Sequence, residues 1–132
     1  MRRWALAAVL VLATGCATLE KKPPYLTGSW GGPHAGVAFS GGLANVRLDC
    51  GSGTIDGLLM AAQGGPFEAK GTYRAGPSGP IKVGQIFVSQ LATYSGNVVK
   101  DVMTLNIELE DGTLMGPFTL TQGAPPQLTR CL

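Results

Sequence analysis

Apolar and polar residues alternate over short runs along most of the chain. In the run 43–50, Ala44, Val46 and Leu48 alternate with polar residues, and the run 67–74 repeats this pattern. A period of two is that of a β-strand with one face in a core and the other in water. Segments rich in glycine and proline separate the runs, at 41–42, 51–53, 63–66, 76–80 and 123–126. The pattern therefore predicts many short strands joined by tight turns.

The clearest hairpin signal lies late in the chain. Two alternating runs, 103–110 and 113–121, flank the dipeptide Asp111-Gly112. Asp-Gly between alternating runs is typical of a two-residue turn in which both residues have positive φ. Pro117 has no N–H to give to a neighbouring strand, so we expect it at a sheet edge or a β-bulge. The outward positions of the first run carry Glu108 and Glu110, which we interpret as solubilising carboxylates.

Further strands are expected at 54–60, 81–88 and 91–99, with a short final strand at 128–132. After the first 15 residues, no stretch predicts a helix of two or more turns. The class is therefore all-β. The connections are short and local, and closing the sheet would remove exposed strand edges. We predict a small antiparallel up-and-down barrel of about eight strands over residues 26–132, with a β-sandwich as the alternative.

The N-terminal residues have the composition of a secretory signal peptide. A positive start, Met1-Arg2-Arg3, precedes a short apolar run and the small pair Thr14-Gly15. The run is far shorter than the roughly 20 residues of a membrane-spanning helix. Because Cys16 follows directly, residues 12–16 resemble the lipobox of bacterial lipoproteins. The resemblance implies a signal peptide over residues 1–15, cleavage before Cys16, and acyl chains on its thiol that anchor the protein to a membrane. A secreted protein cleaved near residue 17 is the alternative.

Residues 16–25 are expected to form the lipidated cysteine and a tether. The eight residues from 17 to 24 include Pro23-Pro24, which favours extended chain, and they reach at most about 28 Å. The domain would then lie close to the membrane surface. In a cell with two membranes, analogy with lipoprotein sorting favours the outer one, because Ala17 and not aspartate follows the lipidated cysteine.

Charge and cysteine usage narrow the possible partners and sites. Ten basic residues face eight acidic ones, and Arg2 and Arg3 of the leader account for the excess. The neutral remainder, without a basic block, predicts no nucleic-acid partner.

Once Cys16 is lipidated, Cys50 and Cys131 remain, and an even pair in an exported domain predicts a disulfide. Two buried free thiols are the alternative. No cofactor or metal site is expected, because one histidine and two isolated cysteines do not make a zinc site.

The segment Gly28-Ser29-Trp30 resembles the G-x-W motif that opens avidin-like and lipocalin-like barrels. In those families the tryptophan plugs one end of the barrel and an arginine near the chain end packs on it. The resemblance implies that role for Trp30 and Arg130, and it implies no ligand. The domain also resembles small envelope proteins of unknown function.

Candidates for catalysis are few. His34 is the only histidine and lies in a turn-rich segment, where we interpret it as an exposed loop residue. Asp49 and Asp56 flank the expected turn at 51–53 and could approach each other there, but carboxylates at turns are usually solvated strand ends. We therefore expect no catalytic residues and no enzyme, with a hydrolase built around His34 as a remote alternative.

Binding remains as the expected function. The sequence predicts a lipid-anchored, non-catalytic binding module of the bacterial cell envelope, for a small apolar ligand or a partner protein. A structural or assembly lipoprotein that uses a strand edge, and a domain similar to protease inhibitors, are alternatives. Four aromatic or methionine residues could line a binding site: Phe87, Tyr94, Met103 and Met115. Packing in the core would explain them equally well.

Overall fold

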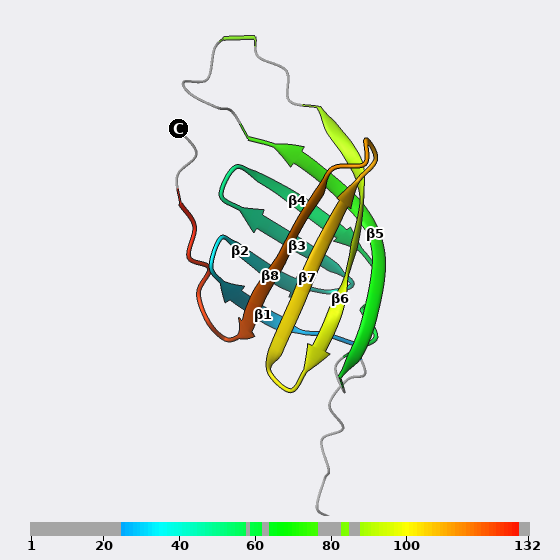
Figure 1. Ribbon diagram of the computed structural model, residues 1–132, viewed down its shortest axis with the longest axis vertical. Helices are drawn as coiled ribbons and strands as arrows, with labels where there is room; N and C mark the ends of the chain where they lie inside the picture. The colour runs from blue at the N-terminus through cyan, green and yellow to red at the C-terminus, as the bar shows by residue number, and fades with distance from the viewer. Residues whose placement is uncertain (1–24, 58, 62–63, 77–82, 85–87, 130–132) are drawn as a thin grey trace, which may run out of the picture.

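Eight antiparallel strands close into a barrel in the computed structural model (Figure 1), which describes residues 25–57, 59–61, 64–76, 83–84 and 88–129. No helix occurs among these residues. The strands are β1 (Gly28–Gly32), β2 (Ala35–Ser40), β3 (Leu43–Leu48), β4 (Gly51–Asp56), β5 (Gly65–Ala75), β6 (Ser89–Val99), β7 (Val102–Leu109) and β8 (Leu114–Gln122).

Each strand pairs with the next one along the chain, and β8 pairs with β1 to close the barrel. The predicted all-β, up-and-down barrel of eight strands is confirmed, and the sandwich alternative is wrong. The predicted signal peptide and nearly all of the predicted tether lie outside the described residues. The closing seam is short, because only Trp30 and Gly31 of β1 are in register with β8, opposite Gln122 and Thr121.

The barrel has two ends. We call the end that holds Tyr25 the proximal end. Because neighbouring strands are antiparallel, the β2–β3, β4–β5 and β6–β7 connections also lie there. The distal end carries the β1–β2, β3–β4 and β7–β8 turns and the long β5–β6 connection (Figure 1).

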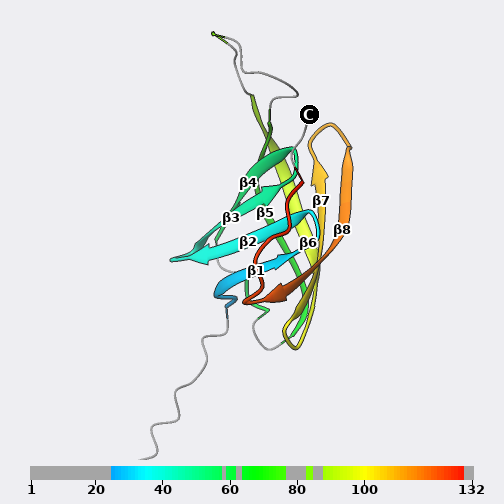
Figure 2. The ribbon, with the colours of Figure 1, turned by 90° about the vertical axis from the view of Figure 1, so that its left-hand side faces the viewer.

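The strands of the two halves differ in length. Strands β1–β4 have five or six residues each, whereas β5–β8 have eight to eleven. Figure 2 shows the short strands stacked on one side of the molecule and the long strands on the other. Alternate residues of both halves point inward, and the described residues include no buried polar or charged side chain. The interior is thus an apolar core of the kind that the alternating pattern predicts.

The β3–β4 turn differs from the expectation. The chain turns at Asp49-Cys50, and the glycines expected to form the turn, Gly51 and Gly53, belong to β4. Both glycines face the interior beside tyrosines: a Cβ at Gly53 would overlap the hydroxyl of Tyr94, and one at Gly51 would overlap that of Tyr73. They make room for bulky neighbours rather than for a bend, so the predicted turn at 51–53 is wrong.

The β7–β8 hairpin is confirmed, with a longer turn than expected. Gly112 has a φ of 89°, but Asp111 is not in the positive-φ region. Asp111 Oδ1 instead accepts a hydrogen bond of 2.9 Å from the backbone N–H of Thr113, and the N–H of Leu109 donates to the Thr113 carbonyl at 2.8 Å. Of the sheet edge or bulge expected at Pro117, the structure has a bulge, because the register with β7 shifts between Leu105 and Ile107.

Two predicted strands are not confirmed. Most of 81–88 lies outside the described residues, and its Val83-Gly84 pair forms a turn. In the predicted final strand, Leu128 and Thr129 have no strand pairing, and residues 130–132 lie outside the described residues. Gln127, the residue before this segment, makes an isolated parallel bridge with Pro33.

Residues 123–129 form what we call the strap, which runs along the outside of the short half. It starts at the proximal end, where the N–H of Gly123 donates to the Ser29 carbonyl at 2.7 Å, and it reaches the distal end, where the N–H of Thr129 donates to Asp49 Oδ1 at 2.7 Å. Between them, the backbone of Gln127 bonds to those of Gly32 and His34. Glycines let the strap approach the short strands closely: a Cβ at Gly36 of β2 would lie 2.6 Å from the Cβ of Pro126.

Candidate functional site

The predicted covalent sites are only partly described. Cys50, in the β3–β4 turn, is disulfide-bonded. Its predicted partner, Cys131, and the predicted lipidation site, Cys16, lie outside the described residues. The Cys50–Cys131 pairing and the acylation of Cys16 therefore stay predictions.

Trp30 is buried at 2% exposure in β1. Its indole Nε1–H donates to the Thr27 carbonyl at 3.1 Å, which turns the indole toward the proximal end. Arg130 lies outside the described residues, so its predicted packing on Trp30 stays a prediction.

His34 contacts Asp49 across two turns of the distal end. Its Nδ1 hydrogen-bonds to Asp49 Oδ2, while Asp49 Oδ1 accepts the N–H of Thr129. The Thr129 hydrogen bond chiefly lowers the pKa of the Asp49 carboxyl, with a smaller contribution from His34. No described hydroxyl hydrogen-bonds to His34, which a nucleophile would do in a triad. The three groups together fasten the β1–β2 turn, the β3–β4 turn and the strap to one another.

The two aspartates that the sequence placed near one turn are at opposite ends of the molecule. Asp56 pairs in register with Leu43 at the proximal end, whereas Asp49 lies at the distal end. The hypothesis that they approach each other is therefore wrong, because it depended on the misplaced turn at 51–53. Among the described residues, no group of three or more histidine, cysteine or acidic side chains could hold a metal ion.

Of the four residues that could have lined a ligand cavity, the three that the structure describes belong to the core or pack against it. Tyr94 and Met103 are buried, and Met115 packs against the core from a partly buried position; Phe87 lies outside the described residues. The Tyr94 hydroxyl donates to the Thr72 carbonyl at 2.6 Å, and burial raises the pKa of this hydroxyl. Burial likewise raises the pKa of Tyr73. Both tyrosines fill space that Gly51 and Gly53 leave open.

A large hollow lies on the outer wall of the long half. This outer groove has a volume of about 570 Å³, and its lining residues are Lys70, Gly71, Leu91, Ala92, Thr93, Glu108, Leu109 and Glu110. The rung Gly71–Ala92–Leu109 crosses β5, β6 and β7 in register and forms its floor. The side chains of Ala92 and Leu109 point into the core, so the floor is backbone. The hollow lies above it, between the outward side chains of Lys70, Thr93 and Glu108 on one side and those of Leu91 and Glu110 on the other.

Charged and apolar groups border the outer groove. On one side, Lys70 Nζ donates to Thr93 Oγ1 at 2.9 Å, next to Glu108 in the same rung. On the other side, the Leu91 N–H donates to Glu110 Oε2 at 3.4 Å, and the Leu91 side chain is 63% exposed. Leu114, also exposed, lies in register with Glu108 on β8. The groove thus combines two carboxylates, one ammonium group and apolar surface.

Sequence reasoning placed Glu108 and Glu110 on the outer face but did not find the groove. The alternation gives the outward direction of each side chain. The neighbours Lys70 and Leu91 come from other strands, however, and only the register across β5, β6 and β7 brings them together.

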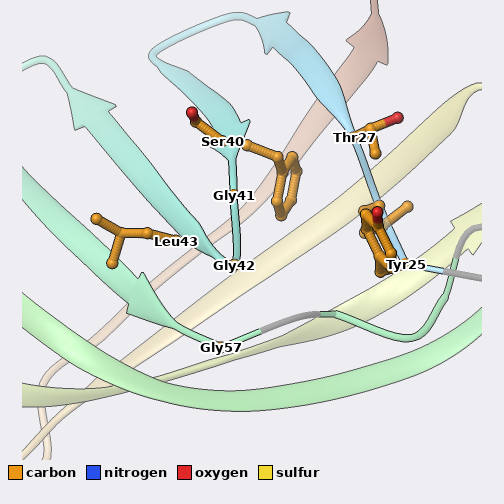
Figure 3. Close-up of a pocket in the computed structure, with 9 residues that line it drawn as sticks. Tyr25, Thr27, Ser40, Gly41, Gly42, Leu43 and Gly57 are labelled. Atoms are coloured by element: carbon orange, nitrogen blue, oxygen red, sulfur yellow. The ribbon is translucent and has the colours of Figure 1, made fainter. Parts of the chain in front are cut away.

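A smaller hollow of about 30 Å³ lies at the proximal end, between the start of the described chain and the β2–β3 turn. Figure 3 shows Tyr25 and Thr27 on one side of this hollow and Gly41-Gly42 on the other, with Leu43 pointing away from Tyr25. The hollow is about the size of one or two water molecules. We read it as a packing gap beside the place where the chain joins the barrel.

Comparisons with known proteins provide no family or function. No protein-family model matches the chain, and no curated protein or solved structure matches it either. Within the described residues, no helix has the length and apolar character needed to cross a membrane.

Proposed function

We propose that this chain is a lipid-anchored, non-catalytic binding module of the bacterial cell envelope, and that it holds a segment of a partner protein in the outer groove. The observation that carries the proposal is the contrast between a packed interior and a large, amphipathic hollow on the outer wall. In a two-membrane cell, we place the anchor in the outer membrane.

The packed interior favours a protein partner over a small apolar ligand. Lipocalin-sized barrels hold such ligands in a central cavity, whereas Tyr94, Leu105 and Ile107 fill the interior here. The outer groove is open, and its floor spans three strands. Its two carboxylates against one ammonium group favour a segment with basic and apolar side chains.

We also propose that His34 has a structural role and no catalytic one. It is supported by the surroundings of His34, whose Nδ1 is engaged with Asp49 while the second oxygen of Asp49 holds the strap. In this arrangement His34 connects the β1–β2 turn to the β3–β4 turn.

The anchor is tested by metabolic labelling with radioactive palmitate. We expect label on the wild-type protein and none on the Cys16→Ser variant. Wild-type protein without label would contradict the lipid anchor.

The outer groove is tested by photocrosslinking in intact cells. The photoreactive residue benzoylphenylalanine replaces Leu91 in the groove or, as a control, the exposed Ala38 on the outer face of β2. We expect a discrete adduct from position 91 alone, and its loss in the Glu108→Lys/Glu110→Lys background. Equal adducts from both positions, or an adduct that survives the charge reversal, would contradict the groove.

One observation favours assembly through a strand edge as a second candidate function. Because β1 is short and meets β8 only at Gln122 and Thr121, the part of β8 at 114–118 has no partner on the β1 side among the described residues. An added strand from another protein could pair there. The proline at 117 weakens that edge by removing a donor. Crosslinks from position 114 with none from position 91 would favour this candidate.

A further inference from the structure

The proximal end of the barrel presents one or two exposed apolar side chains from each of its three connections. Leu43 follows the β2–β3 turn and is 44% exposed, Met60 in the β4–β5 connection is 66% exposed, and Val99 beside the β6–β7 turn is 60% exposed. Val102, on the other side of that turn, is also exposed. These four residues, together with the neighbouring backbone, are called the proximal rim.

Backbone contacts join the three connections into one surface. The N–H of Gly57 donates to the Gly42 carbonyl at 2.9 Å, which links the β4–β5 connection to the β2–β3 turn. At the other end of the β4–β5 connection, Gly65 lies in register with Val98 beside the β6–β7 turn. The Asp101 carbonyl of that turn accepts a hydrogen bond of 2.8 Å from the N–H of Gln122 in β8. The exposed apolar groups therefore belong to a single end surface.

The chain joins the barrel at this same rim. The N–H of Leu26 donates to the Leu59 carbonyl at 2.8 Å, next to Met60, and Tyr25 lines the small hollow beside Leu43. The start of the described chain is therefore fixed to the rim (Figure 3). Between Tyr25 and Cys16 there are eight residues, which reach at most about 28 Å.

We propose that the proximal rim lies on the lipid bilayer, with Leu43, Met60 and Val99 inserted at the level of the headgroups. This inference rests on the proposed acylation of Cys16, because the acyl chains bring the rim to the membrane and the short tether keeps it there. Once anchoring has removed the entropic cost of association, a few apolar side chains are enough to set the orientation.

The charged groups of the rim are compatible with this orientation. Asp56, Lys100 and Asp101 are exposed there. Lys100 can extend its ammonium group to the lipid phosphates, whereas the aspartates must stay in water. Contact is thus shallow and does not require anionic lipid, which agrees with the neutral composition of the chain after the leader.

Environment-sensitive fluorescence tests the orientation on the full-length, acylated protein. A single cysteine carries the dye at Met60→Cys on the rim or, as a matched control of similar exposure, at Val88→Cys near the distal end, where the wild-type side chain is 76% exposed. The protein is placed in vesicles of phosphatidylethanolamine and phosphatidylglycerol, with and without lipids spin-labelled near the headgroup. We expect a blue shift and strong quenching at position 60 and neither at position 88.

The alternative outcomes each overturn the inference in a distinguishable way. Protein that floats with the vesicles while both dyes report water contradicts the rim contact and leaves the anchor intact. A blue shift at position 60 without quenching by the spin-labelled lipid would mean that a second protein copy covers the rim. A shift at position 88, alone or together with position 60, contradicts the orientation. Protein that does not float with the vesicles overturns the anchor and the inference together.

Discussion

The two halves of the barrel are built differently. The long strands β5–β8 contribute most of the large buried side chains, among them Tyr94, Met103, Leu105, Ile107 and Leu120. The short strands β1–β4 contribute fewer large ones, Trp30, Leu48 and Ile55; their other buried side chains are small, with glycines between them: Ala35, Val37, Ala44 and Val46. The short half has correspondingly less apolar surface with which to stabilise itself.

External fastenings compensate for this difference. The strap covers the outside of β1 and β2, and both the disulfide-bonded Cys50 and the His34–Asp49 contact lie at turns of the short half. One closed sheet is thus stabilised in two ways, by core packing on one side and by covalent and surface fastenings on the other. Four predictions test this division, in order of decreasing effect.

The largest effect is expected from core truncation in the long half. Leu105→Ala removes a fully buried side chain from β7 and should lower the free energy of unfolding by about 2–5 kcal/mol. Val46→Ala, at an equally buried position of β3, should cost less, about 1.6 kcal/mol for two methyl groups. Urea denaturation of both variants measures the difference. Equal losses would contradict the unequal division of the core.

Removal of the disulfide should have the next largest effect. The Cys50→Ala/Cys131→Ala double variant, which removes Cys50 and its predicted partner, is expected to lose about 2–4 kcal/mol of stability, because the unfolded chain would regain the freedom that a loop closed between these two residues denies it. The same denaturation experiment applies. An unchanged unfolding midpoint would show that the cross-link does not fasten the short half.

Displacement of the strap should be smaller and local. In Gly31→Ala, the new Cβ would overlap the Ala124 carbonyl oxygen, and we expect a loss of about 1–3 kcal/mol. Hydrogen exchange should quicken at the Gln127 amide, which bonds to the Gly32 carbonyl. Ser29→Ala, an exposed position on the same strand, serves as the control and should leave exchange at Gln127 unchanged.

The smallest effect concerns pH at the distal end. The hydrogen bond from Thr129 holds the pKa of Asp49 below 3.8, its ordinary value. A lowered carboxyl pKa contributes stability above the unfolded-state pKa, and the contribution is lost as pH falls through the folded-state pKa. We therefore expect the Thr129 amide to detach only under acidic conditions, with an NMR titration midpoint below 3.8 that Asp49→Asn abolishes. A midpoint at or above the ordinary value would contradict this role.

Much of the fold could be predicted because the period of two is a local property. The alternation over 43–50 and 103–121 located β3, β7 and β8, and the proline at 117 located the bulge. The turn at Gly51 and Gly53 was wrong because a glycine that makes room for a tyrosine looks the same in sequence as a glycine in a turn. Only the barrel shows that Tyr73 and Tyr94 lie opposite these glycines.

The outer groove and the proximal rim could not be predicted for a related reason. Lys70, Leu91 and Glu108 belong to three strands, and they become neighbours only through a specific register. Leu43, Met60 and Val99 come from three separate connections, which share a surface because the barrel is closed. A sequence pattern predicts whether a side chain points inward or outward. Which residues lie next to it depends on the pairing of strands that are distant in the sequence.

The even number of strands determines at which end of the barrel the chain enters and leaves. With eight strands, β8 ends at the end of the barrel where β1 begins, so both ends of the barrel sequence leave the barrel at the proximal end, which faces the bilayer in the orientation that we propose. The strap then crosses the outside of the barrel once more, so Thr129 lies at the distal end. A fluorescent protein or epitope joined after that point would start on the side that faces away from the lipid, where it would leave the contact with the bilayer undisturbed.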